Sequence, residues 1–189
     1  MEDSKAQQLL SGAQRFDLEC LAEIYDRFSP GLYAYAMRLL GDTAQAEDCV
    51  AETFSRFLRA LRAGQGPKNH LQAYLYRIAH NWITDQYRRQ PPPPLNLDET
   101  IYEDASHNPE IQTGERIEQR RVRAALKLLT AEQRQVVVLK FIEGWGNEEV
   151  AVAIQKPLGA VKALQHRALA SLRKLLLEGE TTDGSQPRN

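Results

Sequence analysis

Residues 91–115 read PPPPLNLDETIYEDASHNPEIQTGE, and this stretch decides how the whole chain is organised. Four consecutive prolines cannot continue a helix and favour an extended polyproline conformation. The residues behind them lack hydrophobic periodicity and carry six acidic side chains but no Lys or Arg. We therefore predict a flexible acidic linker over residues 91–114, which divides the chain of 189 residues into two parts.

The part before the linker, residues 1–90, shows apolar side chains at helical spacing and no strand pattern. Pro30 is expected to separate two short helices, and Asp42 provides the N-cap of a third. The expected helices cover residues 18–28, 30–40, 42–63 and 69–89. The spacing therefore predicts a small helical domain.

The part after the linker, residues 115–178, is helical as well. Thr130 and Gln133 fit a capping box ahead of an apolar run. Asn147 provides the cap of a short helix, and a longer helix begins at Gly159. A short helix, a tight turn and a longer helix describe a helix-turn-helix.

These observations predict an all-α protein with two small helical domains, 1–90 and 115–178. Because the linker separates them, we expect the two domains to bury little apolar surface against each other. Residues 179–189 are rich in Thr, Ser, Gly and Pro and are expected to form a disordered tail.

Composition excludes several classes of protein. Hydrophobic residues make up 42% and charged residues 26%, which is ordinary for a soluble globular protein. No apolar run approaches the roughly 18 residues that cross a bilayer, and the start MEDSKAQQLL lacks the order of a secretory signal. We expect a cytoplasmic protein without membrane insertion. Cys20 and Cys49 are expected to be buried reduced thiols rather than a disulfide or metal site.

Charge is distributed unevenly, although the formal net charge is only -1. Residues 116–178 carry twelve basic and six acidic side chains, whereas the linker is purely acidic. This asymmetry is typical of a nucleic-acid-binding protein with an acidic connector, although an excess of charge also serves solvation alone.

The fourth expected helix contains LQAYLYRIAHNWITDQYRR (71–89), which mixes aromatic and basic residues. Aromatic faces stack on unpaired bases and basic side chains hold phosphates, a combination suited to single-stranded nucleic acid. The alternative is that its aromatic residues simply pack the core. At 3.6 residues per turn, Arg77, Asn81 and Arg88 share one face of the helix, and the apolar residues point elsewhere. The nucleic-acid interpretation therefore fits the first group, and the core-packing interpretation fits the second.

Two further helix faces carry polar and charged residues. One, on the third helix, consists of Asp48, Glu52, Ser55 and Arg59. Such a face is usually only solvated, and contact with another protein is the alternative. The other, on the last helix, consists of Lys162, His166, Arg167 and Arg173. A helix-turn-helix offers this helix to the major groove of DNA, and an ordinary helical hairpin is the alternative.

No catalytic arrangement emerges from the sequence. The four histidines lie in separate segments, and no nucleophile motif, metal motif or Gly-rich phosphate loop is present. We therefore expect no enzyme activity, metal, cofactor or small-molecule substrate.

Over residues 16–178 the chain resembles the extracytoplasmic-function group of bacterial sigma factors. The motifs of the first part are Ile24-Tyr25-Asp26, Leu39-Leu40-Gly41-Asp42, Ala46-Glu47-Asp48, Glu52-Thr53-Phe54 and Tyr74-Leu75-Tyr76-Arg77-Ile78-Ala79-His80-Asn81. Those of the second part are Glu132-Gln133-Arg134, Glu143-Gly144, Glu148-Glu149-Val150-Ala151 and Gly159-Ala160-Val161-Lys162.

The resemblance implies a factor that binds core RNA polymerase, recognises promoter DNA and opens its strands, with an anti-sigma factor as a further partner. It implies that Asp48, Glu52, Ser55 and Arg59 face the polymerase. The residues implied at the opened minus-ten element are Tyr74, Arg77, His80, Asn81, Trp82, Asp85, Arg88 and Arg89. Those implied at the minus-thirty-five element are Lys162, Ala163, His166, Arg167 and Arg173.

The second part departs from the family pattern at two places. Gln155 and Lys156 stand where the family has Gly and an aliphatic residue, so Gln155 must accept a left-handed backbone at a cost, or the turn differs. The last helix begins Gly159-Ala160-Val161-Lys162-Ala163-Leu164-Gln165, without two hydroxyls and an arginine that are usual there. We therefore predict weaker or differently ordered direct reading of the minus-thirty-five element.

Two other functions stay open at this level. A stand-alone helix-turn-helix regulator would bind duplex DNA without polymerase and would use the first ninety residues as a sensor or dimerisation module. It would need neither the charged face within residues 42–54 nor the aromatic and basic helix within residues 74–89. An adaptor would bind an anti-sigma factor or another helical protein and little DNA. Transcription with core polymerase in vitro distinguishes both from a sigma factor.

Overall fold

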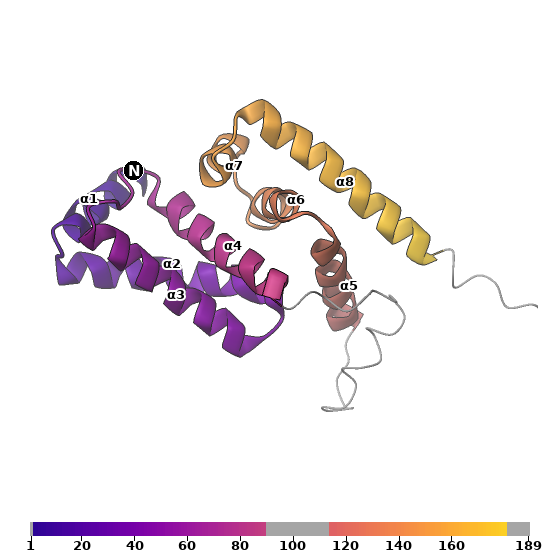
Figure 1. Cartoon of the computed structure of the whole chain (residues 1–189), viewed down its shortest axis with the longest axis horizontal. Helices are drawn as coiled ribbons and strands as arrows, with labels where there is room; N and C mark the ends of the chain where they lie inside the picture. Colours follow the sequence, from indigo (N-terminus) through magenta and orange to yellow (C-terminus); the bar gives the residue numbers. More distant parts are fainter. Residues whose placement is uncertain (1, 90–113, 181–189) are drawn as a thin grey trace, which may run out of the picture.

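The computed structural model describes residues 2–89 and 114–180 (Figure 1). Every regular element within these residues is a helix, which confirms the predicted all-α class. The elements are α1 (Glu2–Gln14), α2 (Leu18–Leu40), α3 (Thr43–Arg62), α4 (Leu71–Arg89), α5 (Gly114–Leu128), α6 (Ala131–Val137), the π-helical turn η2 (Val138–Ile142), α7 (Asn147–Ile154) and α8 (Leu158–Glu180). The predicted linker, up to residue 113, and the predicted tail beyond Glu180 lie outside the described residues.

Helices α1–α4 form a first unit around one core. α2 packs against α3 and α4 through buried side chains such as Leu32 and Phe57. Local signals set the connection between α2 and α3. Gly41 ends α2 in the left-handed conformation, with φ of 73°, and the Asp42 carboxylate accepts the Gln45 N–H at 2.8 Å. The predicted N-cap at Asp42 is therefore confirmed.

Pro30 lies inside α2, so the prediction of two short helices over residues 18–40 is wrong. An internal proline removes one helical N–H and crowds the preceding turn, at a cost of about 3 kcal/mol. Phe28 before it and Leu32 after it are buried in the same core. Burial of each such side chain stabilises the fold by about 1.5–3 kcal/mol. Tertiary packing on both sides of the proline therefore keeps the helix continuous.

Helix α1 has no counterpart among the expected helices. Its apolar face is short, and Leu10 is nearly fully buried against the rest of the unit. The side-chain amide of Gln7 donates to the Lys68 carbonyl and that of Gln14 to the Pro67 carbonyl, each at 3.0 Å. These two hydrogen bonds tie α1 to the segment that leads into α4.

Both cysteines are free thiols of the first unit, and of the two only Cys49 is buried as expected. Cys49 on α3 is fully buried, and burial raises the pKa of its thiol to about 12. Cys20 on α2 is partly buried, and its pKa is also raised, chiefly by desolvation.

Helices α5–α8 form a second unit. The Thr130 hydroxyl accepts the Gln133 N–H at 3.3 Å, and the Gln133 side-chain oxygen accepts the Thr130 N–H at 3.1 Å. The predicted capping box is therefore confirmed. α8 packs on α6 and α7 through its buried residues Val161 and Ala168. The arrangement of α7, a tight turn and α8 is a helix-turn-helix, as predicted.

Asn147 does not cap α7, contrary to prediction. Gly146 takes that position, and the Glu149 carboxylate accepts the Gly146 N–H at 2.6 Å. The Asn147 side chain instead accepts a hydrogen bond from the Gln165 amide on α8 at 2.9 Å. A contact between the two helices has therefore replaced a local cap.

The first and second units pack against each other, whereas the sequence led us to expect little apolar contact. α4 lies against α7, and α2 against α5; in Figure 1 the orange α7 lies beside α4, with the yellow α8 beyond it. The rings of Tyr76 on α4 and Trp145 lie 5.0 Å apart. The prediction failed because α4 has aromatic side chains on two sides, and only one side faces its own core.

Candidate functional site

The polar and charged face of α3 consists of the four residues predicted from spacing. Asp48, Ser55 and Arg59 are exposed, whereas Cys49, Phe54 and Phe57 on the opposite side are buried. Because the apolar stripe fixes the rotation of α3 about its axis, this face points to solvent as a unit.

Glu52 is held by two arginines of its own helix. Its carboxylate lies 2.7 Å from Arg56 Nε and 3.2 Å from an Arg59 terminal nitrogen. The hydrogen bond from Arg56 is the main cause of a lowered pKa for Glu52, which stays ionised. Part of its charge is therefore balanced within α3, and the exposed Asp48 carboxylate is the more available negative charge on this face.

The outer face of α4 brings most of the predicted strand-opening residues together. The Arg77 guanidinium lies 5.1 Å from the centroid of the Tyr74 ring, a cation–π contact, and Asp85 lies 3.8 Å from Arg88. On this helix, exposed side chains belong to Asn81, Arg88 and Arg89. Partly exposed side chains belong to Tyr74, Arg77, Trp82 and Asp85. The face thus offers aromatic surface and positive charge side by side, as stacking and phosphate contacts require.

His80, which is predicted to contact DNA, is buried in this arrangement, with its ring 2% exposed. The ring Nε2 lies 3.0 Å from the Ala131 carbonyl, which only accepts, so Nε2 carries the proton. Nδ1 then accepts from the Tyr35 hydroxyl at 2.7 Å. Burial, followed by the positive charge of Arg134, lowers the pKa of His80 to about 3. A neutral ring with both nitrogens engaged is a structural residue.

The predicted DNA-reading face of α8 is exposed. It consists of Lys162, Ala163, His166, Arg167 and Arg173. Two residues that looked unusual for base reading have other roles. Leu164 is 6% exposed and belongs to the core. Gln165 is partly buried and uses its amide to hold Asn147 on α7. The departures at these positions therefore concern the packing of the helix-turn-helix.

The turn of the helix-turn-helix contains a strained residue. Gln155 has φ of 56° and ψ of 44°, in the left-handed region. For a residue with a side chain, this conformation costs roughly 1–2 kcal/mol. Lys156 beside it pairs with Glu132 of α6 at 2.9 Å. The turn therefore keeps the geometry that a glycine would provide, and Gln155 accepts the strain.

Replacing Gln155 with glycine (Q155G) is expected to raise the free energy of unfolding by about 0.5–1 kcal/mol, because the relieved strain exceeds the added flexibility of the unfolded chain. Urea denaturation followed by circular dichroism measures the change. The matched control is Gln155→Ala, whose Cβ keeps the strain. Equal stabilisation by both variants would contradict the explanation.

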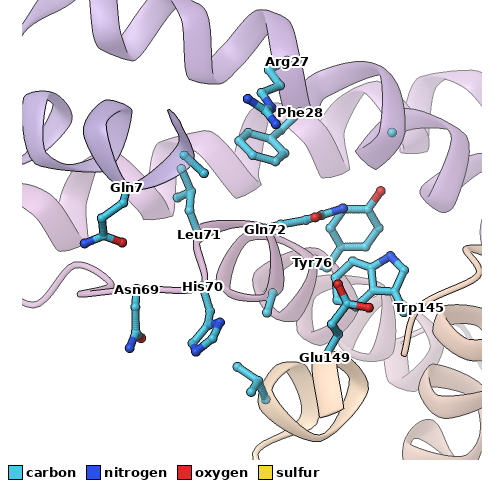
Figure 2. A pocket seen from close by; sticks show the side chains of 14 residues that line it. Gln7, Arg27, Phe28, Asn69, His70, Leu71, Gln72, Tyr76, Trp145 and Glu149 are labelled. Atoms are coloured by element: carbon cyan, nitrogen blue, oxygen red, sulfur yellow. The ribbon is translucent and has the colours of Figure 1, made fainter. Parts of the chain in front are cut away.

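A cleft of about 770 Å³ opens between the two units, next to the start of α4 (Figure 2). Figure 2 shows Tyr76 and Trp145 side by side in it, with His70 and Glu149 nearby. Among the described residues, no group of three or more His, Cys, Asp or Glu side chains is arranged to hold a metal ion. No helix in the described part of the chain has the length and apolar character needed to span a membrane.

Sequence reasoning missed Arg134, whose guanidinium joins the two units by lying 4.3 Å from the centroid of the Tyr87 ring on α4. Arg134 is 5% exposed and donates from Nε to the Leu126 carbonyl at 2.8 Å and from a terminal nitrogen to the Leu129 carbonyl at 2.9 Å. It thus satisfies carbonyls at the end of α5 that the helix leaves without partners. In the sequence it is marked only by its place in the motif Glu132-Gln133-Arg134, two residues before the apolar run that begins at Val136.

Two family models match the chain. The model for Sigma-70 region 2 matches residues 24–91, and the model for Sigma-70, region 4 matches residues 119–172. The chain is 32% identical over 180 residues to the ECF RNA polymerase sigma factor SigL of Mycobacterium tuberculosis, with 89% of this chain and 96% of SigL covered. It is 28% identical to the ECF RNA polymerase sigma factor BldN of Streptomyces coelicolor, with 93% and 67% covered.

Two solved structures share the fold. One is CnrH in complex with the cytosolic domain of CnrY, with a TM-score of 0.65, 24% identity and coverage of 90% of this chain and 96% of that chain. The other is RpoE in complex with the anti-sigma factor NepR from Bartonella quintana, with a TM-score of 0.55, 24% identity and coverage of 86% and 97%.

Proposed function

Because the chain belongs to the extracytoplasmic-function sigma factors of RNA polymerase, we propose that its three exposed helix faces divide the steps of transcription initiation among them. The membership rests on a relative 32% identical over 89% of this chain and on models for both sigma regions. The chain is thus a sigma factor, which binds core RNA polymerase, recognises promoter DNA and promotes strand opening. Sigma factors are initiation factors and not enzymes.

The first step is docking on polymerase through α3. Asp48, Ser55 and Arg59 are exposed there on one side of the helix, with Glu52 partly exposed among them. A rigid amphipathic helix with its apolar side buried presents such residues in fixed positions, which favours a specific protein contact. We assign Asp48 the main electrostatic role, because Glu52 shares its charge with Arg56 and Arg59.

The second step is strand opening on α4, and the juxtaposition of Arg77 with the Tyr74 ring is the observation that carries it. An extruded base gains stacking on an aromatic face and polar contacts that it lacks inside the duplex. Asn81, Arg88 and Arg89 are exposed on this helix and would hold the base edge and the backbone, with Asp85 and Trp82 beside them. His80 has no part in this step.

The third step is recognition of the upstream promoter element by α8. Lys162, Arg167 and Arg173 supply the positive charge that phosphates require, and the exposed His166 and Ala163 lie among them, with the Ala163 methyl group facing the groove. Gln165 positions α8 on α7 through Asn147. We therefore propose that this unit contributes affinity more than base discrimination.

Scrambling only the minus-thirty-five element is expected to weaken promoter binding by the reconstituted holoenzyme about tenfold or less, since a single good bidentate base contact is worth about 1–3 kcal/mol and few donors are available. Gel-shift titration at fixed salt measures the loss. Scrambling the minus-ten element is the control and should cost more. A loss of a thousandfold from the upstream element alone would contradict the prediction.

For these roles we keep the domain boundaries that the sequence predicts. We propose a polymerase-binding and minus-ten unit over residues 1–90, an acidic connector over 91–114, a minus-thirty-five unit over 115–178 and a tail over 179–189. We also propose a cytoplasmic location, where polymerase acts, and an anti-sigma factor as partner. The complex of RpoE with NepR supports the last point, because its sigma factor shares this fold.

Transcription in vitro with core polymerase tests the function as a whole. Genomic fragments selected by the holoenzyme provide the template, and core enzyme alone provides the background. Transcripts that require the chain are expected. Their absence, with a normally folded chain, would overturn the proposal and favour a stand-alone DNA-binding regulator.

The role of α4 has its own test in the same system. The double variant Arg77→Ala/Asn81→Ala is expected to bind core polymerase normally but to lose permanganate reactivity of unpaired thymines at the promoter. Arg62→Ala, an exposed arginine at the end of α3, is the matched control. Normal strand opening by the double variant would remove α4 from this role.

A further inference from the structure

Helix α1 lies before the residues that either family model matches, so membership of the family does not account for it. It is nevertheless firmly packed on the first unit. Leu10 and Ala13 are at most 1% exposed. A Cβ atom on Gly12 would lie 2.2 Å from the Cys20 sulfur, so α1 approaches α2 as closely as only a glycine allows. The packing therefore fixes α1 as a support for whatever its polar side contacts.

The polar side of α1 holds the segment that connects α3 to α4, residues 63–70. Gln7 and Gln14 are seven residues apart, so they lie on one face of the helix. The Gln7 amide donates to the Lys68 carbonyl and the Gln14 amide to the Pro67 carbonyl, each at 3.0 Å. Two consecutive carbonyls of the connecting segment are thus held by a helix from outside it.

The backbone of the connecting segment explains why such a support matters. Gly64 and Gly66 give the segment conformational freedom. Its last residue, His70, has φ of 50°, in the left-handed region that is unfavourable for a residue with a side chain. In Figure 2 the Gln7 side chain points toward the part of the segment that carries His70. The strain at one such residue and the stabilisation by two hydrogen bonds are similar in size, so the α1 contacts can decide whether the strained conformation is kept.

The conformation of His70 determines how α4 begins. The His70 carbonyl accepts the Tyr74 N–H at 3.0 Å, which is the bond that starts the helix. The Tyr74 ring lies 5.1 Å from the Arg77 guanidinium and 6.3 Å, between ring centroids, from Phe57 on α3. Loss of the first turn would therefore move the aromatic part of the strand-opening face away from its basic part. A ring that must be ordered during the reaction adds that cost to the barrier, whereas a ring already in place does not.

We propose that Gln7 and Gln14 are positioning residues for strand opening: they hold the connecting segment and thereby keep Tyr74 where an extruded base can stack. The proposal rests on the proposed strand-opening role of α4 and gives α1 a part in it. Neither glutamine contacts DNA in this role, because each acts through the backbone of the segment. The affinity for core polymerase is expected to stay unchanged, because the proposed docking face lies on α3.

Amide hydrogen exchange in the free chain, followed by NMR, tests the positioning without polymerase. The double variant Gln7→Ala/Gln14→Ala keeps α1 helical, because alanine has the highest helix propensity. The Tyr74 N–H is expected to exchange about tenfold faster, which corresponds to about 1.4 kcal/mol, while the amides of α3 keep their rates. Gln8→Ala, at an exposed position of the same helix, is the matched control and should change nothing. Unchanged exchange at Tyr74, or equally faster exchange throughout the first unit, would overturn the proposal.

Promoter opening by the holoenzyme provides the second measurement. At saturating holoenzyme, the double variant is expected to open duplex promoter DNA about tenfold more slowly than the natural sequence, as permanganate reactivity against time measures. A template whose minus-ten region is already unpaired by mismatches should restore the normal rate of initiation, which a general loss of folded protein would not permit. Normal opening of the duplex, or slow initiation on both templates, would overturn the proposal. Failure of the natural sequence to open the duplex would overturn the proposed function instead, while exchange at Tyr74 would still decide the positioning.

Discussion

Core RNA polymerase is expected to bind the Asp48→Lys variant at least about 30-fold more weakly than the natural sequence. Asp48 is exposed on α3, and the polymerase surface that receives its carboxylate is expected to be basic. Like charges brought together in an interface cost several kcal/mol, and a 30-fold loss corresponds to about 2 kcal/mol. Fluorescence anisotropy of labelled chain against core polymerase measures the affinity, and the loss should diminish as salt is raised.

Glu47→Lys is the matched control for this variant. Glu47 is also exposed, but it lies about 100° around the helix from Asp48. It should therefore retain most of the affinity. Glu52→Gln is expected to lose less than Asp48→Lys, because Arg56 and Arg59 already balance the Glu52 charge. Equal losses for Glu47→Lys and Asp48→Lys would show that overall charge, and not this face, controls binding.

His80→Phe is expected to lower the free energy of unfolding by about 2–4 kcal/mol at pH 7, because the variant leaves the buried Tyr35 hydroxyl and the Ala131 carbonyl without their partner. The difference from the natural sequence is expected to shrink by about 2 kcal/mol at pH 5. Urea denaturation at the two pH values measures both quantities.

The direction of this pH effect follows from the pKa of His80, which is about 3 in the folded protein and 6.5 in the unfolded chain. As the pH falls below 6.5, the unfolded chain binds a proton that the folded state refuses, so stability falls by about 1.4 kcal/mol per pH unit. Phenylalanine removes this contribution, whereas other groups titrate alike in both proteins and cancel. A constant difference between pH 7 and pH 5 would contradict the buried neutral ring.

Signals that act within one turn of chain predicted the structure best. Asp42 and Thr130 cap helices as their sequence context indicates, because the capping side chain and its backbone donor are three residues apart. The same reasoning failed at Pro30, where burial of neighbours on both sides offsets the missing hydrogen bond. It also failed at Asn147, whose side chain found a partner on α8. Predictions from neighbouring residues therefore fail where a residue distant in the sequence competes for the same atoms.

The same difference between local signals and distant contacts explains which residues of the candidate site could be predicted. Spacing alone predicted which side of α3 and α8 is exposed, because each helix has one apolar stripe. On α4 it could not separate His80 from Asn81, since the second unit covers the former and leaves the latter exposed. Arg38 on α2 pairs with Glu143, which lies 105 residues away, across a stretch without hydrophobic periodicity. No pattern within either half of the sequence specifies such a contact.

Because Cys49 is buried, the reactivity of its thiol also reports whether the first unit is folded. With a pKa of about 12, only about one thiol in 100,000 is a thiolate at pH 7, so alkylating reagents and peroxide should react with it very slowly. Local opening of the α3–α4 packing returns the thiol to water and to ordinary reactivity. The rate of alkylation at Cys49 therefore gives the opening free energy of the first unit in the natural sequence, with no added label and in the presence of polymerase.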